Sequence, residues 1–125
     1  MYFSATGTTE GAANKIASVT GGDTMAIIPV QPYTNADLDW NDRNSRSSIE
    51  MNNPESRPQI KPAQKNISDY DIVFIGYPIW WDLAPTVVNT FIESNNLKGK
   101  TVIPFATSGG SSIRNSVSKL KSSYP

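Results

Sequence analysis

The sequence lacks two residue types that carry much of enzyme chemistry, because its 125 residues include no cysteine and no histidine. The absence of cysteine excludes disulfides, thiolate metal sites and a cysteine nucleophile. The absence of histidine removes the commonest metal ligand and the commonest general base near neutral pH. Little room is left for hydrolytic or metal chemistry, so we expect a bound cofactor to carry any reaction.

An excess of either charge is also lacking, since 11 lysines and arginines balance 11 acidic residues. A neutral chain gives no indication of binding to nucleic acid or to an anionic membrane surface. No apolar run approaches the ~20 residues that span a bilayer, and no basic and then apolar leader opens the chain. We therefore expect a cytoplasmic protein of one domain, with no nucleic-acid partner and no membrane partner.

Hydrophobic periodicity predicts alternating strands and helices. Strands are expected at 2–3, 24–30, 71–76 and 101–106, and helices at 8–19, 85–94 and 113–122, with a short one within 45–51. The stretch 31–66 is polar and holds four prolines, which predicts an irregular crossover. The alternation indicates one α/β domain over 1–125, built as a doubly wound parallel sheet with helices on both faces. The apolar face of the first helix is expected to be Ala12, Ala13, Ile16, Ala17 and Val19.

The first candidate site is the loop SATGTT, because ligands of such sheets bind outside the carboxyl ends of the strands. Ser4, Thr6, Thr8 and Thr9 offer hydroxyl donors there. Gly7 permits an unusual backbone angle, and the helix that follows opens with unpaired N–H groups and a partial positive charge. No lysine or arginine lies in this loop, and neither a P-loop nor a G-x-G-x-x-G pattern is present. We therefore expect a neutral cradle for one terminal phosphate, with an ordinary capped helix start as the alternative.

The second candidate loop contains two adjacent tryptophans. Trp80 and Trp81 follow Pro78 and Ile79 at the end of the third expected strand. A flat indole suits stacking on a planar ring. We expect one of the two tryptophans to pack in the core instead.

The third candidate loop follows the last expected strand. It opens with Thr107, Ser108, Gly109 and Gly110, and its two glycines expose backbone N–H and C=O groups. Such groups suit the polar edge of a heterocycle. A Gly/Ser turn without a ligand is the alternative.

Taken together, the three loops resemble those of the flavodoxin family. The first loop of that family has the pattern [TS]-x-T-G-x-T, which Ser4, Thr6, Gly7 and Thr9 meet here. GYPIWW is similar to the family's second loop, whose aromatic residue flanks the flavin ring, and FATSGGS is similar to the third, which meets the pyrimidine end of that ring. The resemblance implies non-covalently bound FMN, held by Ser4, Thr6, Gly7, Thr8, Thr9, Pro78, Ile79, Trp80, Trp81, Thr107, Ser108, Gly109 and Gly110.

The same resemblance implies a flavodoxin-like sheet of order 2-1-3-4 in which the family's fifth strand is missing. It implies electron transfer through the flavin between redox partner proteins, a reductase and an acceptor, with no catalytic residue and no metal. Two alternatives stay open: an NAD(P)H-dependent FMN or quinone reductase on the same fold, and a non-redox scaffold that has lost FMN. If the truncated sheet pairs with another copy, a homo-oligomer is expected.

Overall fold

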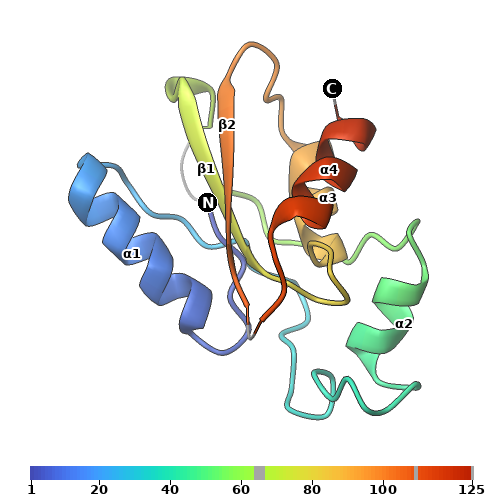
Figure 1. The fold of residues 1–125 in the computed structure, drawn as a ribbon. Coiled ribbons are helices and arrows are strands. Elements are labelled where there is room, and N and C mark those ends of the chain that lie inside the picture. Colours follow the sequence, from blue (N-terminus) through green and yellow to red (C-terminus); the bar gives the residue numbers. More distant parts are fainter. Residues whose placement is uncertain (64–66, 109, 125) are drawn as a thin grey trace.

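A computed structural model describes residues 1–63, 67–108 and 110–124 (Figure 1). In chain order, the elements are α1 (Thr8–Thr20), α2 (Arg46–Asn52), the 3-10 turn η1 (Ile67–Asp69), β1 (Ile72–Pro78), α3 (Thr86–Ser94), β2 (Thr101–Thr107) and α4 (Arg114–Ser123). The four helices and the last two strands were all expected, with bounds that agree to within two residues. The α/β class is therefore confirmed.

The sheet is parallel and is built around β1. β1 and β2 pair in parallel over their whole length, from Ile72 opposite Thr101 to Pro78 opposite Thr107. Tyr2 extends the sheet on the other side of β1 through a parallel bridge to Gly76, and a second parallel bridge joins Tyr2 to Ala26. These contacts place the opening segment between residue 26 and β1, as the order 2-1-3-4 requires.

The expected strands at 2–3 and 24–30 are not regular strands, which corrects the sequence-based assignment. The Tyr2 N–H donates to the Met25 carbonyl at 3.0 Å, and the Ile27 N–H donates to the Tyr2 carbonyl at 2.6 Å. Pro29 has no N–H with which to continue such a ladder, and it bridges Ile60 in the antiparallel sense instead. Pairing in this part of the sheet is therefore limited to isolated bridges.

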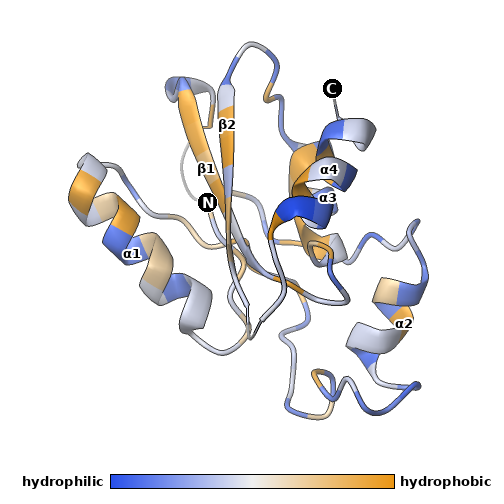
Figure 2. Ribbon diagram, viewed as in Figure 1, coloured by the Kyte–Doolittle hydropathy of each residue, from blue (hydrophilic) through white to orange (hydrophobic). Residues whose placement is uncertain are grey.

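The helices cover the two faces of the sheet unequally. α1 lies on one face, and α3 and α4 lie together on the other (Figure 1). Hydrophobic colour is concentrated in β1 and α3 (Figure 2), and the side chains of Ile75, Tyr77, Val87 and Phe91 are at most 1% exposed. The core thus lies mainly between β1 and α3.

The apolar face expected for α1 is correct in its middle and wrong at its end. Ala13 is buried, whereas Val19 is 87% exposed. At about 100° per residue, Val19 lies roughly 120° around the helix from Ala13. It therefore points away from the sheet.

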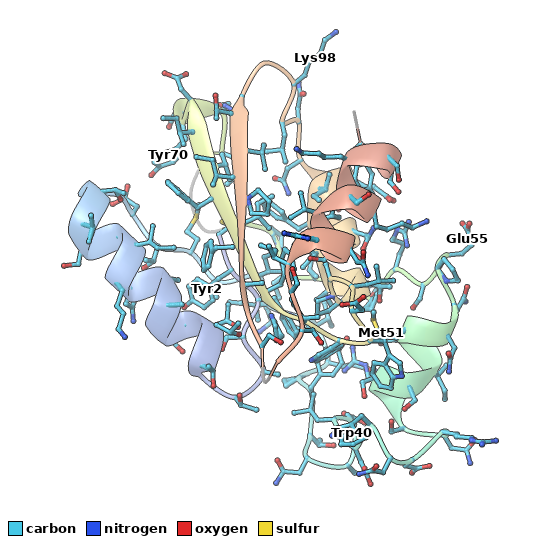
Figure 3. The ribbon with its side chains drawn as sticks, viewed as in Figure 1. Tyr2, Trp40, Met51, Glu55, Tyr70 and Lys98 are labelled. Atoms are coloured by element: carbon cyan, nitrogen blue, oxygen red, sulfur yellow. The ribbon has the colours of Figure 1, made fainter. Side chains whose placement is uncertain are left out.

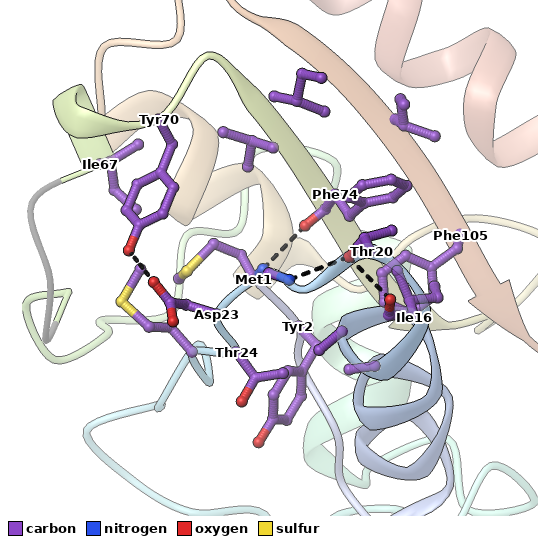
Figure 4. A pocket seen from close by; sticks show the side chains of 17 residues that line it. Met1, Tyr2, Ile16, Thr20, Asp23, Thr24, Ile67, Tyr70, Phe74 and Phe105 are labelled. Atoms are coloured by element: carbon purple, nitrogen blue, oxygen red, sulfur yellow. Dashed lines mark hydrogen bonds between the residues drawn. The ribbon is translucent and has the colours of Figure 1, made fainter.

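A cavity lies beside β2 on each face of the sheet. A cavity of about 360 Å³ lies between α1 and the sheet, where Ile16 faces Phe74 and Phe105 (Figure 4). A second cavity of about 510 Å³ lies on the opposite face, with Val102 and Val117 in its lining. Among the helices that the structure describes, none is long and apolar enough to cross a membrane.

Candidate functional site

The three candidate loops meet at the carboxyl edge of the sheet, where parallel strands end side by side (Figure 1). Thr107 joins all three of them. Its hydroxyl shares a 2.8 Å hydrogen bond with the Thr9 hydroxyl at the start of α1. Its backbone carbonyl accepts from the Ile79 N–H at 3.0 Å. The structure therefore brings together segments that are about 30 to 100 residues apart in the chain.

The first loop leads directly into the amino end of α1. Gly7 precedes the helix with a φ of 93°, a left-handed conformation that glycine adopts readily, and no side chain caps the helix. The Gly7 N–H donates to Ser4 Oγ at 3.0 Å, which holds the loop closed. Thr6 and Thr8 are exposed, with their hydroxyl oxygens 3.5 Å apart. Uncapped N–H groups and exposed hydroxyls together could hold a phosphate.

Thr9 has a different place from the other hydroxyls of this loop. It is only 1% exposed, and its hydroxyl faces Thr107 rather than the open side of the loop. The contact ties the first turn of α1 to the end of β2.

Trp80 is the tryptophan that packs inward. Its ring meets Phe3 edge to face, with centroids 5.6 Å apart and planes at 89°. It meets Tyr33 with centroids 5.4 Å apart and planes at 67°. The prediction that one of the two tryptophans packs in the core is confirmed in part, because Trp80 is partly buried against the core residues.

Trp81 is the exposed tryptophan, and its backbone is strained. The Trp80 N–H donates to the Leu83 carbonyl at 2.9 Å, and the Leu83 N–H donates back at 3.0 Å. Both residues between them have positive φ, 48° at Trp81 and 65° at Asp82. Positive φ at a bulky residue such as tryptophan costs about 1–3 kcal/mol. The turn presents an indole that is 45% exposed, directly after Pro78 and Ile79.

The crossover contributes a network that the sequence analysis missed. The Tyr33 hydroxyl donates to the Glu50 carboxylate, and the Arg46 guanidinium lies 3.8 Å from the centroid of the Tyr33 ring. Arg46 Nε also pairs with Glu50 at 2.9 Å. Burial, followed by the hydrogen bond to Glu50, raises the pKa of Tyr33 far above its usual range. Because Tyr33 also contacts Trp80, this network supports the second loop from behind.

One signal for the network was present in the sequence. Arg46 and Glu50 are four residues apart on a helix, a spacing that favours an ion pair. Nothing in the sequence indicated that Tyr33 would join them.

Trp40 also belongs to the crossover. It lies beyond the carboxyl ends of the strands and is 72% exposed (Figure 3).

The third loop is a compact polar turn. Ser108 Oγ accepts from the Ser111 N–H at 2.7 Å and from the Gly110 N–H at 3.1 Å. Ser108 and Gly110 are exposed, and Thr107 is half-buried. Gly109, which the sequence analysis also assigned to the site, lies outside the described residues.

Among the described residues of the three loops, none lines either of the two cavities beside β2, so the candidate site is separate from both. The edge offers uncharged donors at the first loop, one accessible indole at the second and a polar turn at the third. This donor set fits an uncharged grip on a phosphate and a planar ring.

Solved structures of similar chains have the same fold. A candidate flavoprotein from Bacteroides eggerthii DSM 20697 is 66% identical with a TM-score of 0.97, covering 99% of this chain and 78% of that one. A candidate flavoprotein from Bacteroides uniformis ATCC 8492 is 53% identical with a TM-score of 0.96, covering 99% and 80%. A flavoprotein in complex with FMN from Lactobacillus acidophilus NCFM is 24% identical with a TM-score of 0.77, covering 97% and 80%.

No curated protein matches this chain. The family model described as Flavodoxin matches residues 1–125. The similarity to the Bacteroides proteins is consistent with that match over nearly the whole chain. The chain therefore belongs to the flavodoxin family.

Proposed function

We propose that this protein binds FMN without a covalent bond at the edge formed by the three loops, and that it passes electrons through the flavin between redox partner proteins. The observation that carries the proposal is the uncapped amino end of α1, with exposed hydroxyls beside it, at the same edge as the exposed Trp81. Membership of the flavodoxin family and the FMN complex of the Lactobacillus relative support it.

The phosphate is assigned to the first loop. FMN carries a single phosphate, which the N–H groups of the first turn of α1 and the hydroxyls of Thr6 and Thr8 would hold without a cation. Ser4 keeps the loop in shape through its bond to Gly7. Thr9 anchors the start of the helix from the buried side.

The flavin ring is assigned to the space beside Trp81. An indole that is exposed, and whose backbone is held by a closed turn, can stack on a flat ring with little further ordering. Trp80 and Tyr33 support that turn from the core. Bound FMN supplies the redox chemistry, while the chain binds the ring, orients it and shields one face from water.

The phosphate assignment can be tested with Thr6→Glu, and Thr6→Gln is a control of the same size without the charge. The added carboxylate should repel the phosphate by ~1 kcal/mol or more at close range, which weakens FMN binding about tenfold. Riboflavin has no phosphate and should lose no more affinity in Thr6→Glu than in Thr6→Gln. Equal losses for FMN and riboflavin, measured by flavin fluorescence titration, would show that this loop does not hold the phosphate.

Two further measurements separate the proposed carrier from the alternatives. A carrier loaded with FMN should keep its flavin absorbance for minutes when it is mixed with NADPH, whereas rapid bleaching would favour a reductase. A thousandfold excess of FMN over its Kd should stabilise the protein by about 4 kcal/mol. An unchanged melting temperature with FMN would instead indicate a scaffold that does not bind flavin.

A further inference from the structure

A side chain on α4 reaches the strained turn of the second loop. The Asn115 side-chain amide donates a hydrogen bond to the Asp82 carboxylate. Asp82 and Trp81 are the two positive-φ residues of the turn. Asn115 lies in the first turn of α4, only a few residues after the third loop. This contact therefore links α4 to the turn that carries Trp81.

The turn needs such support because its backbone is unfavourable. Residues with positive φ persist only where their surroundings hold them there. Asp82 tolerates that conformation better than most residues, but Trp81 does not. The two backbone bonds between Trp80 and Leu83 close the turn. The bond from Asn115 fixes the residue next to Trp81 from outside the turn.

The start of α4 is itself anchored in the core. Ser116 is fully buried, and its hydroxyl shares a 3.0 Å hydrogen bond with the Tyr77 hydroxyl of β1. The Ser116 hydroxyl also donates to the Ile113 carbonyl at 2.8 Å. Asn115 is the neighbour of this anchored residue. Its amide therefore extends to Asp82 from a fixed part of the molecule.

We propose that Asn115 is a positioning residue for the Trp81 indole, acting through Asp82 to set where the indole meets the flavin ring. The inference rests on the proposed function, because the position of this indole can be measured through flavin affinity and fluorescence only when a flavin is bound. Asn115 acts on the second loop through Asp82, whereas the phosphate is assigned to the first loop. Loss of Asn115 should therefore affect FMN and riboflavin alike.

The test uses Asn115→Ala, with Ser118→Ala as a matched control at an exposed position of the same helix. The readouts are flavin affinity and the quenching of flavin fluorescence at saturation, which reports on the stacked indole. Asn115→Ala should weaken both FMN and riboflavin about three- to tenfold and reduce the quenching, as contacting residues couple by roughly 0.5–3 kcal/mol. Ser118→Ala should leave affinity and quenching unchanged.

A second pair of variants tests whether the effect passes through Asp82 and Trp81. Asn115→Asp places two carboxylates face to face and should weaken flavin binding further than Asn115→Ala does. Combining Asn115→Asp with Asp82→Asn restores an amide facing a carboxylate, and affinity should return to within about twofold of the parent. In a Trp81→Ala background, Asn115→Ala should have no further effect.

The outcomes separate this inference from the function on which it rests. If the parent protein binds neither FMN nor riboflavin, the proposed function fails. If the parent binds FMN and riboflavin but Asn115→Ala has the same flavin affinity and the same fluorescence quenching as the parent, the positioning role is refuted. The proposed function then stands. A loss of equal size in Ser118→Ala, or additive losses in the Trp81→Ala background, would likewise refute the positioning role, since either result assigns the effect to general stability of α4.

Discussion

Substitution of the two adjacent tryptophans, one at a time, should distinguish effects on folding stability from effects on flavin binding. Trp80 and Trp81 have the same side chain and neighbouring positions, but one packs inward and the other is 45% exposed. We therefore expect Trp80→Ala to act mainly on stability and Trp81→Ala mainly on the flavin. The pair forms its own control, because the chemical change is identical.

The cost of Trp80→Ala follows from its two ring contacts. Truncating a buried tryptophan costs about 3–5 kcal/mol, and Trp80 is only partly buried. Each edge-to-face contact, with Phe3 and with Tyr33, contributes roughly 0.5–1.5 kcal/mol beyond area burial. A net loss of about 2–3 kcal/mol is therefore expected. In a domain of this size it would lower the melting temperature by roughly 10 °C.

The cost of Trp81→Ala is expected to lie in binding instead. Removal of an exposed side chain should change stability by no more than about 0.5 kcal/mol, and the positive φ at this position is unfavourable for alanine too. Loss of a stacked indole should cost about 1–1.5 kcal/mol of flavin binding, or roughly five- to tenfold in Kd.

The assay compares urea unfolding of the flavin-free proteins with FMN titration of the same preparations. Unfolding is followed by far-UV circular dichroism, because tryptophan fluorescence changes with the substitutions themselves. If Trp80→Ala unfolds at the same urea concentration as the parent while Trp81→Ala loses 2 kcal/mol or more, the roles are reversed and the assignment of the accessible indole is wrong.

Three further predictions concern stability. Gly76→Ala should destabilise the protein by about 1–3 kcal/mol in urea unfolding, because the new Cβ would lie 2.1 Å from the Phe105 ring. Gly11→Ala should instead stabilise α1 by up to about 1 kcal/mol in the same assay, because its Cβ would meet nothing within 4 Å. The hydrogen bond from Arg57 is the main cause that lowers the pKa of Glu93 below the 4.5 of an unperturbed carboxyl. The contribution of ionised Glu93 to the free energy of unfolding is therefore present above pH 4.5, and it is lost as the pH falls through the lowered pKa of the folded protein. Glu93→Gln should make the melting temperature less sensitive to acid in that range.

The regular elements could be predicted because their signals are local. The apolar stripe of α3 and the continuous apolar run of β1 each specify one structure within a short window. Their predicted bounds agree with the structure to within two residues. The segment 24–30 has a similarly apolar sequence, but a strand needs a partner. Only isolated bridges form there, because Pro29 cannot donate and the neighbouring chain turns into the first loop.

The meeting of the three loops at one edge could be predicted from the sequence, but the contacts among them could not. The residue types at the loops indicated a phosphate and a flat ring, since such chemistry depends on which groups are present. Which of Trp80 and Trp81 is exposed depends on a turn that is closed by backbone hydrogen bonds. Two identical adjacent residues in the sequence do not show which one the turn exposes. Tyr33 packs against Trp80 from 47 positions away in the chain, a contact that only the folded crossover creates.

The contacts of Thr107 indicate that the three loops act as one unit. Its hydroxyl holds the start of α1 through Thr9, and its carbonyl holds the second loop through Ile79. A shift at the end of β2 would therefore move both walls of the candidate site at once. Because Asn115 follows the same strand and reaches Asp82, α4 adds a third link to the same junction. The candidate site can in this way hold a fixed shape, because hydrogen bonds join its loops to one another and to α4.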